Sequence, residues 1–155
     1  MTVVYSILRR SYAKNPLDGE GALRYGGRWS SIGTRLAYTA ERLSLAIVEY
    51  FVHLDPNDPP NDLVVATAEV PRGVSRKTVS PADLPGNWRQ TPAPPEQALI
   101  GDRFVREHRA AVLIVPSALA PSESNWLINP THREFPQIRL RPLEVFACDA
   151  RFFRN

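Results

Sequence analysis

Residues 36–54 read LAYTAERLSLAIVEYFVHL, a short apolar run that passes directly into a stretch rich in helix formers. The first part predicts a strand over Leu36–Thr39. The second predicts a helix over Ala40–Leu54, because it contains neither glycine nor proline. Thr39 has the chemistry of an N-cap residue before the acidic Glu41. Asp55-Pro56 is expected to end the helix.

Further short elements follow on both sides of this stretch. Ala98, Leu99, Phe104 and Val105 give a second predicted helix an apolar stripe. The longer connections, residues 13–34, 71–95 and 116–137, are predicted as irregular, with Trp88 as the anchor of the second. Few helices and short, scattered strands favour an α+β class and one domain over residues 1–155. The remaining predicted elements are strands over Val3–Leu8, Leu63–Val70, Ala111–Val115 (as a central strand), Ile138–Leu140 and Leu143–Cys148, and a helix over Glu96–Arg109.

The composition is that of a soluble globular domain. The chain has 155 residues, of which 43% are hydrophobic and 23% charged, with a net charge of +3. The arginines are scattered, which argues against a nucleic-acid partner. No apolar run approaches the roughly 20 residues of a membrane span. One cysteine, Cys148, and an N-terminal stretch without the features of a secretory signal predict a cytoplasmic protein.

Several common enzyme motifs are missing from the sequence. It contains no Walker A motif, no HExxH, no CxxC pair and no GxSxG elbow. The histidines His53, His108 and His132 do not have the spacing of zinc ligands. P-loop enzymes, Rossmann dehydrogenases and metal enzymes are therefore disfavoured, and no metal site is expected.

Glu49 is the one carboxylate within the apolar run 46–52 of the predicted helix. At 100° per residue, Arg42, Glu49 and His53 share one narrow face. One interpretation is a solvated stripe with a Glu49–His53 pair. The other is a carboxylate at the floor of a cleft, partly desolvated by its large apolar neighbours. The spacing alone leaves both open.

Residues 19–33, GEGALRYGGRWSSIG, form a glycine-rich segment. It can be an irregular loop with Tyr25 and Trp29 filling the core beneath it. It can also be a ligand-binding segment, because glycines allow close approach to the backbone and successive N–H groups can cradle an anion. Arg28 could then bind a phosphate in bidentate fashion, and Trp29 and Tyr38 could offer flat surfaces to an aromatic ring.

Residues 115–130, VPSALAPSESNWLINP, leave a predicted buried strand with Ser117 and continue to Asn125 and Asn129. These side chains can serve as Ser and Asx turns that bond their own backbone. Alternatively, they form a polar wall across a cleft from Glu49.

Together these segments resemble the RES domain family, whose members are mostly toxins of bacterial toxin–antitoxin modules. The resemblance runs from Val4 to about Phe146. Its specificity lies in a combination of motifs: GGRW at 26–29, AYT at 37–39, a mid-helix glutamate, and VPS at 115–117 followed by LINP at 127–130.

The resemblance implies an ADP-ribosyltransferase-like fold with a mixed β-sheet core and a few flanking helices. It also implies NAD⁺ as substrate, cleaved between nicotinamide and ribose, with water, phosphate or a protein as acceptor; the protein target in some members is an enzyme of nucleotide metabolism. Carried over residue by residue, the catalytic set is Arg28, Tyr38, Glu49 and Ser117. The residues expected to bind NAD⁺ are Arg28, Trp29, Ser31, Tyr38, Ser117 and Asn125.

One position departs from the family pattern. Many members carry an arginine directly after the aromatic residue of the first strand, where this chain has Ser6 after Tyr5. A non-catalytic module that binds a protein or nucleotide is therefore one alternative, and an RNA-targeting toxin is another. The family also implies an Xre-type antitoxin that covers the active site.

Overall fold

The computed structural model describes residues 1–153, whose strands form a single mixed sheet of eight strands in the order β4-β5-β6-β2-β1-β3-β7, with β8 also paired to β3. β4 and β5 are parallel, and the other paired strands are antiparallel. This arrangement confirms the α+β class. The strands are β1 (Thr2–Arg9), β2 (Ala37–Ala40), β3 (Leu63–Val70), β4 (Arg76–Thr78), β5 (Val112–Pro116), β6 (Ser124–Ile128), β7 (Arg139–Leu140) and β8 (Glu144–Val145).

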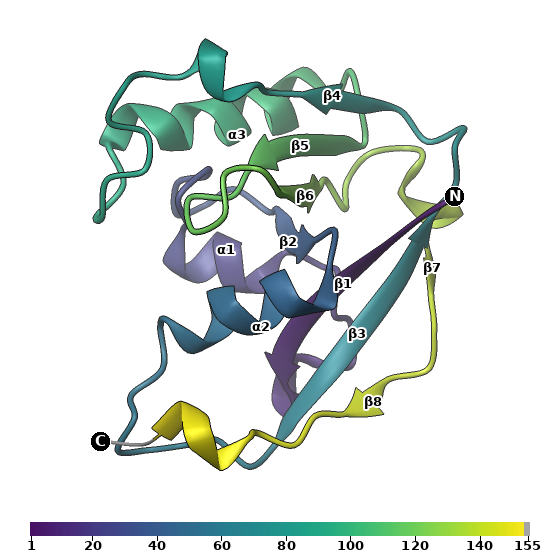
Figure 1. The fold of residues 1–155 in the computed structure, drawn as a ribbon. Coiled ribbons are helices and arrows are strands. Elements are labelled where there is room, and N and C mark those ends of the chain that lie inside the picture. Colours follow the sequence, from purple (N-terminus) through teal and green to yellow (C-terminus); the bar gives the residue numbers. More distant parts are fainter. Residues whose placement is uncertain (154–155) are drawn as a thin grey trace.

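The helices pack on one face of the sheet. They are α1 (Glu20–Tyr25), α2 (Leu43–Phe51) and α3 (Pro95–Glu107), and Figure 1 shows α2 in front of β1 and β2, with α3 beside β4 and β5. Leu45 and Ala46 of α2 are buried in one cluster with Ile7, Ala40 and Val65 of the sheet. None of the helices within residues 1–153 combines the length and the apolar character needed to cross a membrane.

The sheet opens between two neighbouring strands, β1 and β2. β1 pairs with β3 over its whole length, from Thr2 opposite Val70 to Arg9 opposite Leu63. With β2, in contrast, the only paired position is Tyr5 opposite Ala40. From Ser6 onward in β1, and toward Ala37 in β2, the two strands diverge and leave a gap between them.

Most predicted elements are confirmed, with small shifts at their ends. β3 has the predicted bounds, and β1, β2, α3 and β5 begin and end within two residues of those expected. The predicted ends of α2 are wrong. α2 covers Leu43–Phe51, with Arg42 as its N-cap, whereas Thr39 is buried in β2 and donates its hydroxyl to the carbonyl of Trp126 at 2.7 Å. β5 is an interior strand, paired with β4 and with β6, as predicted.

Three elements lie in segments predicted to be irregular: α1, β4 and β6. β6 pairs with β2 on one side and with β5 on the other, so its ladder partners, rather than its own sequence, make it a strand. Trp88 is buried as expected of an anchor. Tyr25 does not fill the core, since 71% of its surface is exposed.

Candidate active site

Glu49 of α2 accepts two short hydrogen bonds from side chains in and next to β5 and β6. Its Oε1 accepts the hydroxyl of Ser117 at 2.7 Å, and its Oε2 accepts the amide N–H of Asn125 at 2.6 Å. The three side chains come from α2, from the residue that follows β5 and from β6. The structure therefore brings together three residues that the sequence resemblance had grouped.

The helix geometry explains why Glu49 points inward. Leu45 and Ala46, which are four and three residues earlier in α2, are both buried. Residues at these spacings lie on the same helix face, so Glu49 continues the buried stripe toward β6. His53 lies beyond the end of α2 and is exposed, and within residues 1–153 no hydrogen bond or ion pair joins it to Glu49. The interpretation of a solvated stripe with a Glu49–His53 pair is therefore wrong.

The surroundings of Glu49 oppose its charge. Burial raises the pKa of this carboxyl above its ordinary value, and the hydrogen bonds from Ser117 and Asn125 offset only part of that effect. The charge of His53 also lowers the pKa, and that of Glu123 raises it. A desolvated carboxylate held by neutral donors is typical of functional sites more than of structural ion pairs.

Ser117 and Asn125 are fixed by contacts of their own. The Ser117 hydroxyl oxygen accepts the backbone N–H groups of Leu119 and Ala120, each at 3.2 Å, while its proton goes to Glu49. Asn125 donates to the carbonyl of Thr39 at 3.2 Å as well as to Glu49. The Ser turn predicted for this loop thus forms, and it also orients Ser117 toward the carboxylate.

The carboxylate lies beside the closed end of the gap between β1 and β2. Asn125, which donates to Glu49, is paired in register with Ala40. Ala40 is also the residue at which β2 meets Tyr5 of β1. Glu49 is therefore placed where the two strands separate, on the face covered by α2.

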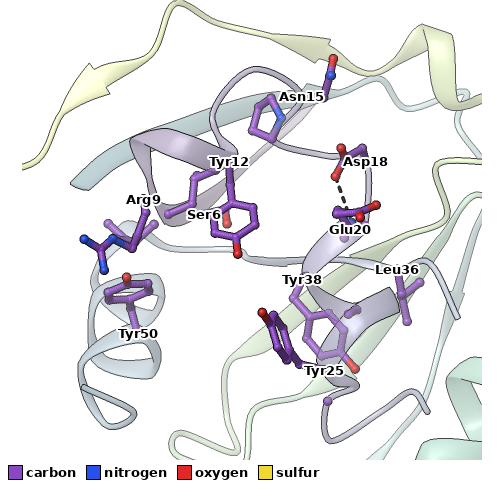
Figure 2. A pocket seen from close by; sticks show the side chains of 18 of the residues that line it. Ser6, Arg9, Tyr12, Asn15, Asp18, Glu20, Tyr25, Leu36, Tyr38 and Tyr50 are labelled. Carbon is purple, nitrogen blue, oxygen red and sulfur yellow. Dashed lines mark hydrogen bonds between the residues drawn. The ribbon is translucent and has the colours of Figure 1, made fainter. Parts of the chain in front are cut away.

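The gap holds a cavity of about 430 Å³. Its volume is in the range of small-molecule sites. Figure 2 shows Ser6 and Tyr12 between Tyr50 on one side and Tyr25 with Tyr38 on the other. The cavity lining includes Tyr50, the neighbour of Glu49, and Gly27, the neighbour of Arg28, but neither Glu49 nor Arg28 itself.

Tyr38 is held at the cavity wall by its hydroxyl group. That oxygen accepts the backbone N–H of Trp29 at 3.0 Å and lies 2.8 Å from the Ser30 hydroxyl. Burial raises the pKa of Tyr38 to about 12, so the phenol stays protonated at neutral pH. A side chain at Gly27 would meet the Tyr38 oxygen at 2.7 Å, which explains the glycine at this position.

The hydrogen bonds that Arg28 donates within residues 1–153 go to neutral acceptors. Its Nη1 donates to the carbonyls of Trp88 at 3.0 Å and Gln90 at 2.9 Å, and its Nη2 donates to the Thr91 hydroxyl at 3.2 Å. Burial lowers the pKa of this guanidinium, and the charge of Glu49 raises it, so Glu49 lies within its electrostatic reach. The guanidinium joins the glycine-rich segment to the loop before α3.

Two residues expected to bind a ligand face elsewhere. Trp29 is 2% exposed and packs with Trp88, their ring centroids 6.4 Å apart, so it has no free face for a substrate ring. Ser31 donates both its N–H and its hydroxyl to Asp102 of α3, at 2.9 and 2.6 Å. Within residues 1–153, no three His, Cys, Asp or Glu side chains cluster closely enough to hold a metal ion.

Tyr12, Tyr25 and Tyr50 are cavity residues that sequence reasoning did not assign to a site. The signal available for them was weak, because Tyr25 comes from the segment 13–34 predicted to be irregular and Tyr12 lies just before it. Their place at the cavity depends on the divergence of β1 and β2, which no local pattern in the sequence encodes.

Comparisons with known proteins agree with this geometry. The model of a family described as "RES domain" matches residues 3–150. A protein of Sphingobium sp. (strain YBL2) named "Prs ADP-ribosylating toxin" is 35% identical over 148 residues, covering 94% of this chain and 92% of that protein. A protein of Yersinia enterocolitica named "Toxin Res" is 34% identical over 151 residues, covering 96% and 98%.

Among solved structures, the M. tuberculosis MbcT–MbcA toxin–antitoxin complex contains a chain with a TM-score of 0.74 and 17% identity. The match covers 92% of this chain and 82% of that chain. At this identity the similarity shows a common fold, which confirms the fold that the sequence resemblance implied.

Proposed function

The chain belongs to the RES domain family, and from that premise we propose that it is a toxin that cleaves NAD⁺ between nicotinamide and ribose. The ADP-ribose goes to water, to phosphate or to a protein. The observation that carries the proposal is the Glu49 carboxylate, which is partly desolvated, is held by Ser117 and Asn125, and directly precedes Tyr50 in the wall of a cavity of about 430 Å³.

Loss of nicotinamide leaves a positively charged, oxocarbenium-like ribose, as in glycoside cleavage. A fixed carboxylate beside that ribose stabilises the developing charge, and the effect is large because the site is partly shielded from water. The two hydrogen bonds to Glu49 fix the carboxylate before the substrate arrives. In this role Glu49 acts in its ionised form, which its environment otherwise disfavours.

Arg28 is proposed to bind the diphosphate of NAD⁺. A guanidinium has five N–H donors. Within residues 1–153, three hydrogen bonds from Arg28 go to Trp88, Gln90 and Thr91. Two donors are then available to an anion. Among the described residues no carboxylate is hydrogen-bonded to this guanidinium, so none of them neutralises its positive charge as a direct partner.

Tyr38 is proposed to present its ring to the nicotinamide, since the ring lines the cavity while the hydroxyl is fixed by Trp29 and Ser30. Ser117 and Asn125 would orient Glu49 and contact the adjoining ribose. Trp29 then serves the site through packing with Trp88, and Ser31 through its bonds to Asp102.

The proposal includes a neutralising partner, because an unrestrained NAD⁺-consuming enzyme in the cytoplasm would harm its own cell. Support comes from the structural neighbour, which was solved as a toxin–antitoxin complex. We propose an antitoxin of the Xre type that covers the cavity. A protein target is a further proposal, supported by the name of the Sphingobium relative.

Product analysis tests the proposed reaction. Purified protein is incubated with NAD⁺, with and without phosphate and cell lysate, and the products are resolved by mass. Nicotinamide release is expected in every arm. ADP-ribose, its phosphorylated form or a modified protein then identifies the acceptor. If nicotinamide stays bound in NAD⁺ in all arms, the proposal is wrong.

A non-catalytic binding module is the second candidate. The observation that favours it is Ser6, which lines the cavity where many family members carry an arginine. Such a module would bind NAD⁺ or a nucleotide in a calorimeter without releasing nicotinamide. The same incubation therefore separates the two functions.

A further inference from the structure

The C-terminal part of the chain forms an arm, residues 144–153, that reaches α2. It begins with β8, which pairs with Val64 and Val65 of β3, and the N–H of Phe146 then donates to the Leu63 carbonyl at 2.9 Å. The arm ends in a short 3-10 turn, Ala150–Phe153, which Figure 1 draws in yellow at the end of the described chain.

Aromatic side chains of the arm surround Phe51, the last residue of α2. The ring of Phe152 stacks on that of Phe51, with centroids 4.3 Å apart and planes inclined by 18°. Phe153 and Phe146 approach the same ring at 5.8 and 6.3 Å. Phe51 therefore makes three aromatic contacts with the arm, which follows it by about a hundred residues in the chain.

Phe51 and Glu49 lie on nearly opposite sides of α2. At 100° per residue, a separation of two positions corresponds to 200°. Glu49 faces Ser117 and Asn125, so Phe51 faces away from them, toward the arm. The last turn of α2 is thus held between β5–β6 on one side and the arm on the other.

The fully buried packing of α2 is concentrated away from its last turn. It has nine residues, no side-chain hydrogen bond caps its N-terminus, and its fully buried side chains, Leu45 and Ala46, lie in its first half. The chain that follows, residues 52–62, is mostly exposed. Ile47 and Tyr50 are partly buried against the sheet, and the aromatic contacts at Phe51 add the packing on the opposite side of the turn that carries Glu49.

We infer that the C-terminal arm is a positioning element for the active site: by stacking on Phe51 it keeps the last turn of α2, and with it Glu49, against Ser117 and Asn125. The inference rests on the proposed function, since Glu49 must be the group that acts on substrate. Phe152 and Phe51 are positioning residues in this scheme and need not touch NAD⁺.

The test compares Phe152→Ala, Phe152→Tyr and Val145→Ala in the full chain. Phe152 is 47% exposed, so its loss should leave the fold intact, and Val145 is an exposed arm residue that serves as the matched control. In Phe152→Ala, kcat for nicotinamide release should fall about tenfold with KM within about twofold, because a displaced catalytic group lowers the rate of the chemical step. Phe152→Tyr keeps the ring and should restore kcat.

Hydrogen exchange of the α2 amides gives a readout that does not depend on activity. Residues 43–52 should exchange faster in Phe152→Ala than in wild type, while β5 and β6 stay unchanged. The inference is overturned if Phe152→Ala matches Val145→Ala in both kcat and exchange, if KM rises while kcat holds, or if kcat falls without faster exchange in α2. Should wild-type protein release no nicotinamide, the proposed function fails, and the exchange comparison still decides whether the arm holds α2.

Discussion

Glu49 and Asp102 are two carboxylates on helices, each accepting the hydroxyl of a serine from a distant part of the chain. Glu49 of α2 is bound by Ser117 and Asn125. Asp102 of α3 is bound by the N–H and hydroxyl of Ser31 and by the hydroxyl of Thr34, at 2.6 to 2.9 Å. The local chemistry is similar, yet the two groups respond to it in opposite ways.

The difference lies in the balance between burial and hydrogen bonding. Burial alone would raise the pKa of Asp102, but the bonds from Ser31 and Thr34, together with the charge of Arg106, outweigh it and lower the pKa. For Glu49 burial prevails, and the pKa is raised. The fold therefore favours the ionised form of Asp102, which connects the glycine-rich segment to α3. It disfavours the ionised form of Glu49. This contrast supports the proposal that Glu49 is the functional carboxylate of the two.

The largest expected effect is the loss of activity when the charge of Glu49 is removed. Glu49→Gln keeps the shape of the side chain and removes its charge, so the developing positive charge on ribose loses its stabilisation. Nicotinamide release should slow by about a hundredfold or more, while calorimetry should find NAD⁺ affinity within about threefold of wild type. Glu144→Gln, at an exposed position in β8, is the control and should keep full activity. A Glu49→Gln rate equal to the control would remove Glu49 from the mechanism.

The next effect concerns the stability that Asp102 provides. Asp102→Asn cannot accept all three hydrogen bonds, and the free energy of unfolding at pH 7 should fall by about 2 kcal/mol, or about 5 °C in melting temperature. A folded-state pKa below the unfolded one means that this stabilisation is present above the unfolded pKa and is lost as the pH falls through the folded pKa. Wild type and variant should therefore converge in acid. Asp58→Asn, on an exposed loop, is the control; equal melting of the two variants at pH 7 would contradict the role of Asp102.

A substitution at Arg28 tests the glycine-rich segment 19–33, which carries Arg28 and also Ser31, the partner of Asp102. Arg28→Lys keeps the charge but cannot reach Trp88, Gln90 and Thr91 together with a phosphate. The Kd for NAD⁺ should rise about tenfold, which is about 1.4 kcal/mol. Arg103→Lys, at an exposed position of α3, should bind as wild type does. Calorimetry that finds the same affinity for both variants would count against diphosphate binding by Arg28.

The smallest expected effect is a change in the melting temperature of Glu49→Gln, opposite in sign to that of Asp102→Asn. A folded-state pKa above the unfolded one means that ionised Glu49 costs stability above the folded pKa and that this cost disappears as the pH falls below the unfolded pKa. Glu49→Gln should therefore melt at the same temperature as wild type or about 2 °C higher at pH 7. A clear loss of stability in thermal unfolding would show that Glu49 is structural like Asp102.

Most strands and helices with a local sequence pattern could be predicted from the sequence. The apolar run 63–70 and the glycine-free stretch that contains α2 were predicted because burial and helix propensity act on neighbouring residues. β6 was missed, because SNWLI begins with turn-forming residues and becomes a strand only through pairing with β2 and β5. α1 was missed for a related reason: six residues with an internal glycine have little intrinsic helicity.

The site shows the same limit more sharply. Ser117 and Asn125 lie far from Glu49 in sequence, so the residues alone left both a polar wall facing Glu49 and local turns open, and the resemblance to a family favoured the first. The structure brings the three within hydrogen-bond distance. The aromatic contacts of Phe152 with Phe51 had no sequence signal at all. For Trp29 the sequence left two interpretations open, a side chain that fills the core and a flat surface for an aromatic ring, and the fold buries it against Trp88.

The ionisation of Glu49 itself tests the account most directly. In protein labelled with carbon-13 at the side-chain carboxyls, an NMR titration follows Glu49 and Asp102 together, with Glu49→Gln and Asp102→Asn assigning the signals and with His53 and Glu123 as the charged neighbours of Glu49. The account predicts that Glu49 titrates above about 4.3, the ordinary value for glutamate, and that Asp102 titrates below about 3.9. A Glu49 midpoint at or below the ordinary value would contradict it, because the carboxylate would then be an unstrained structural group.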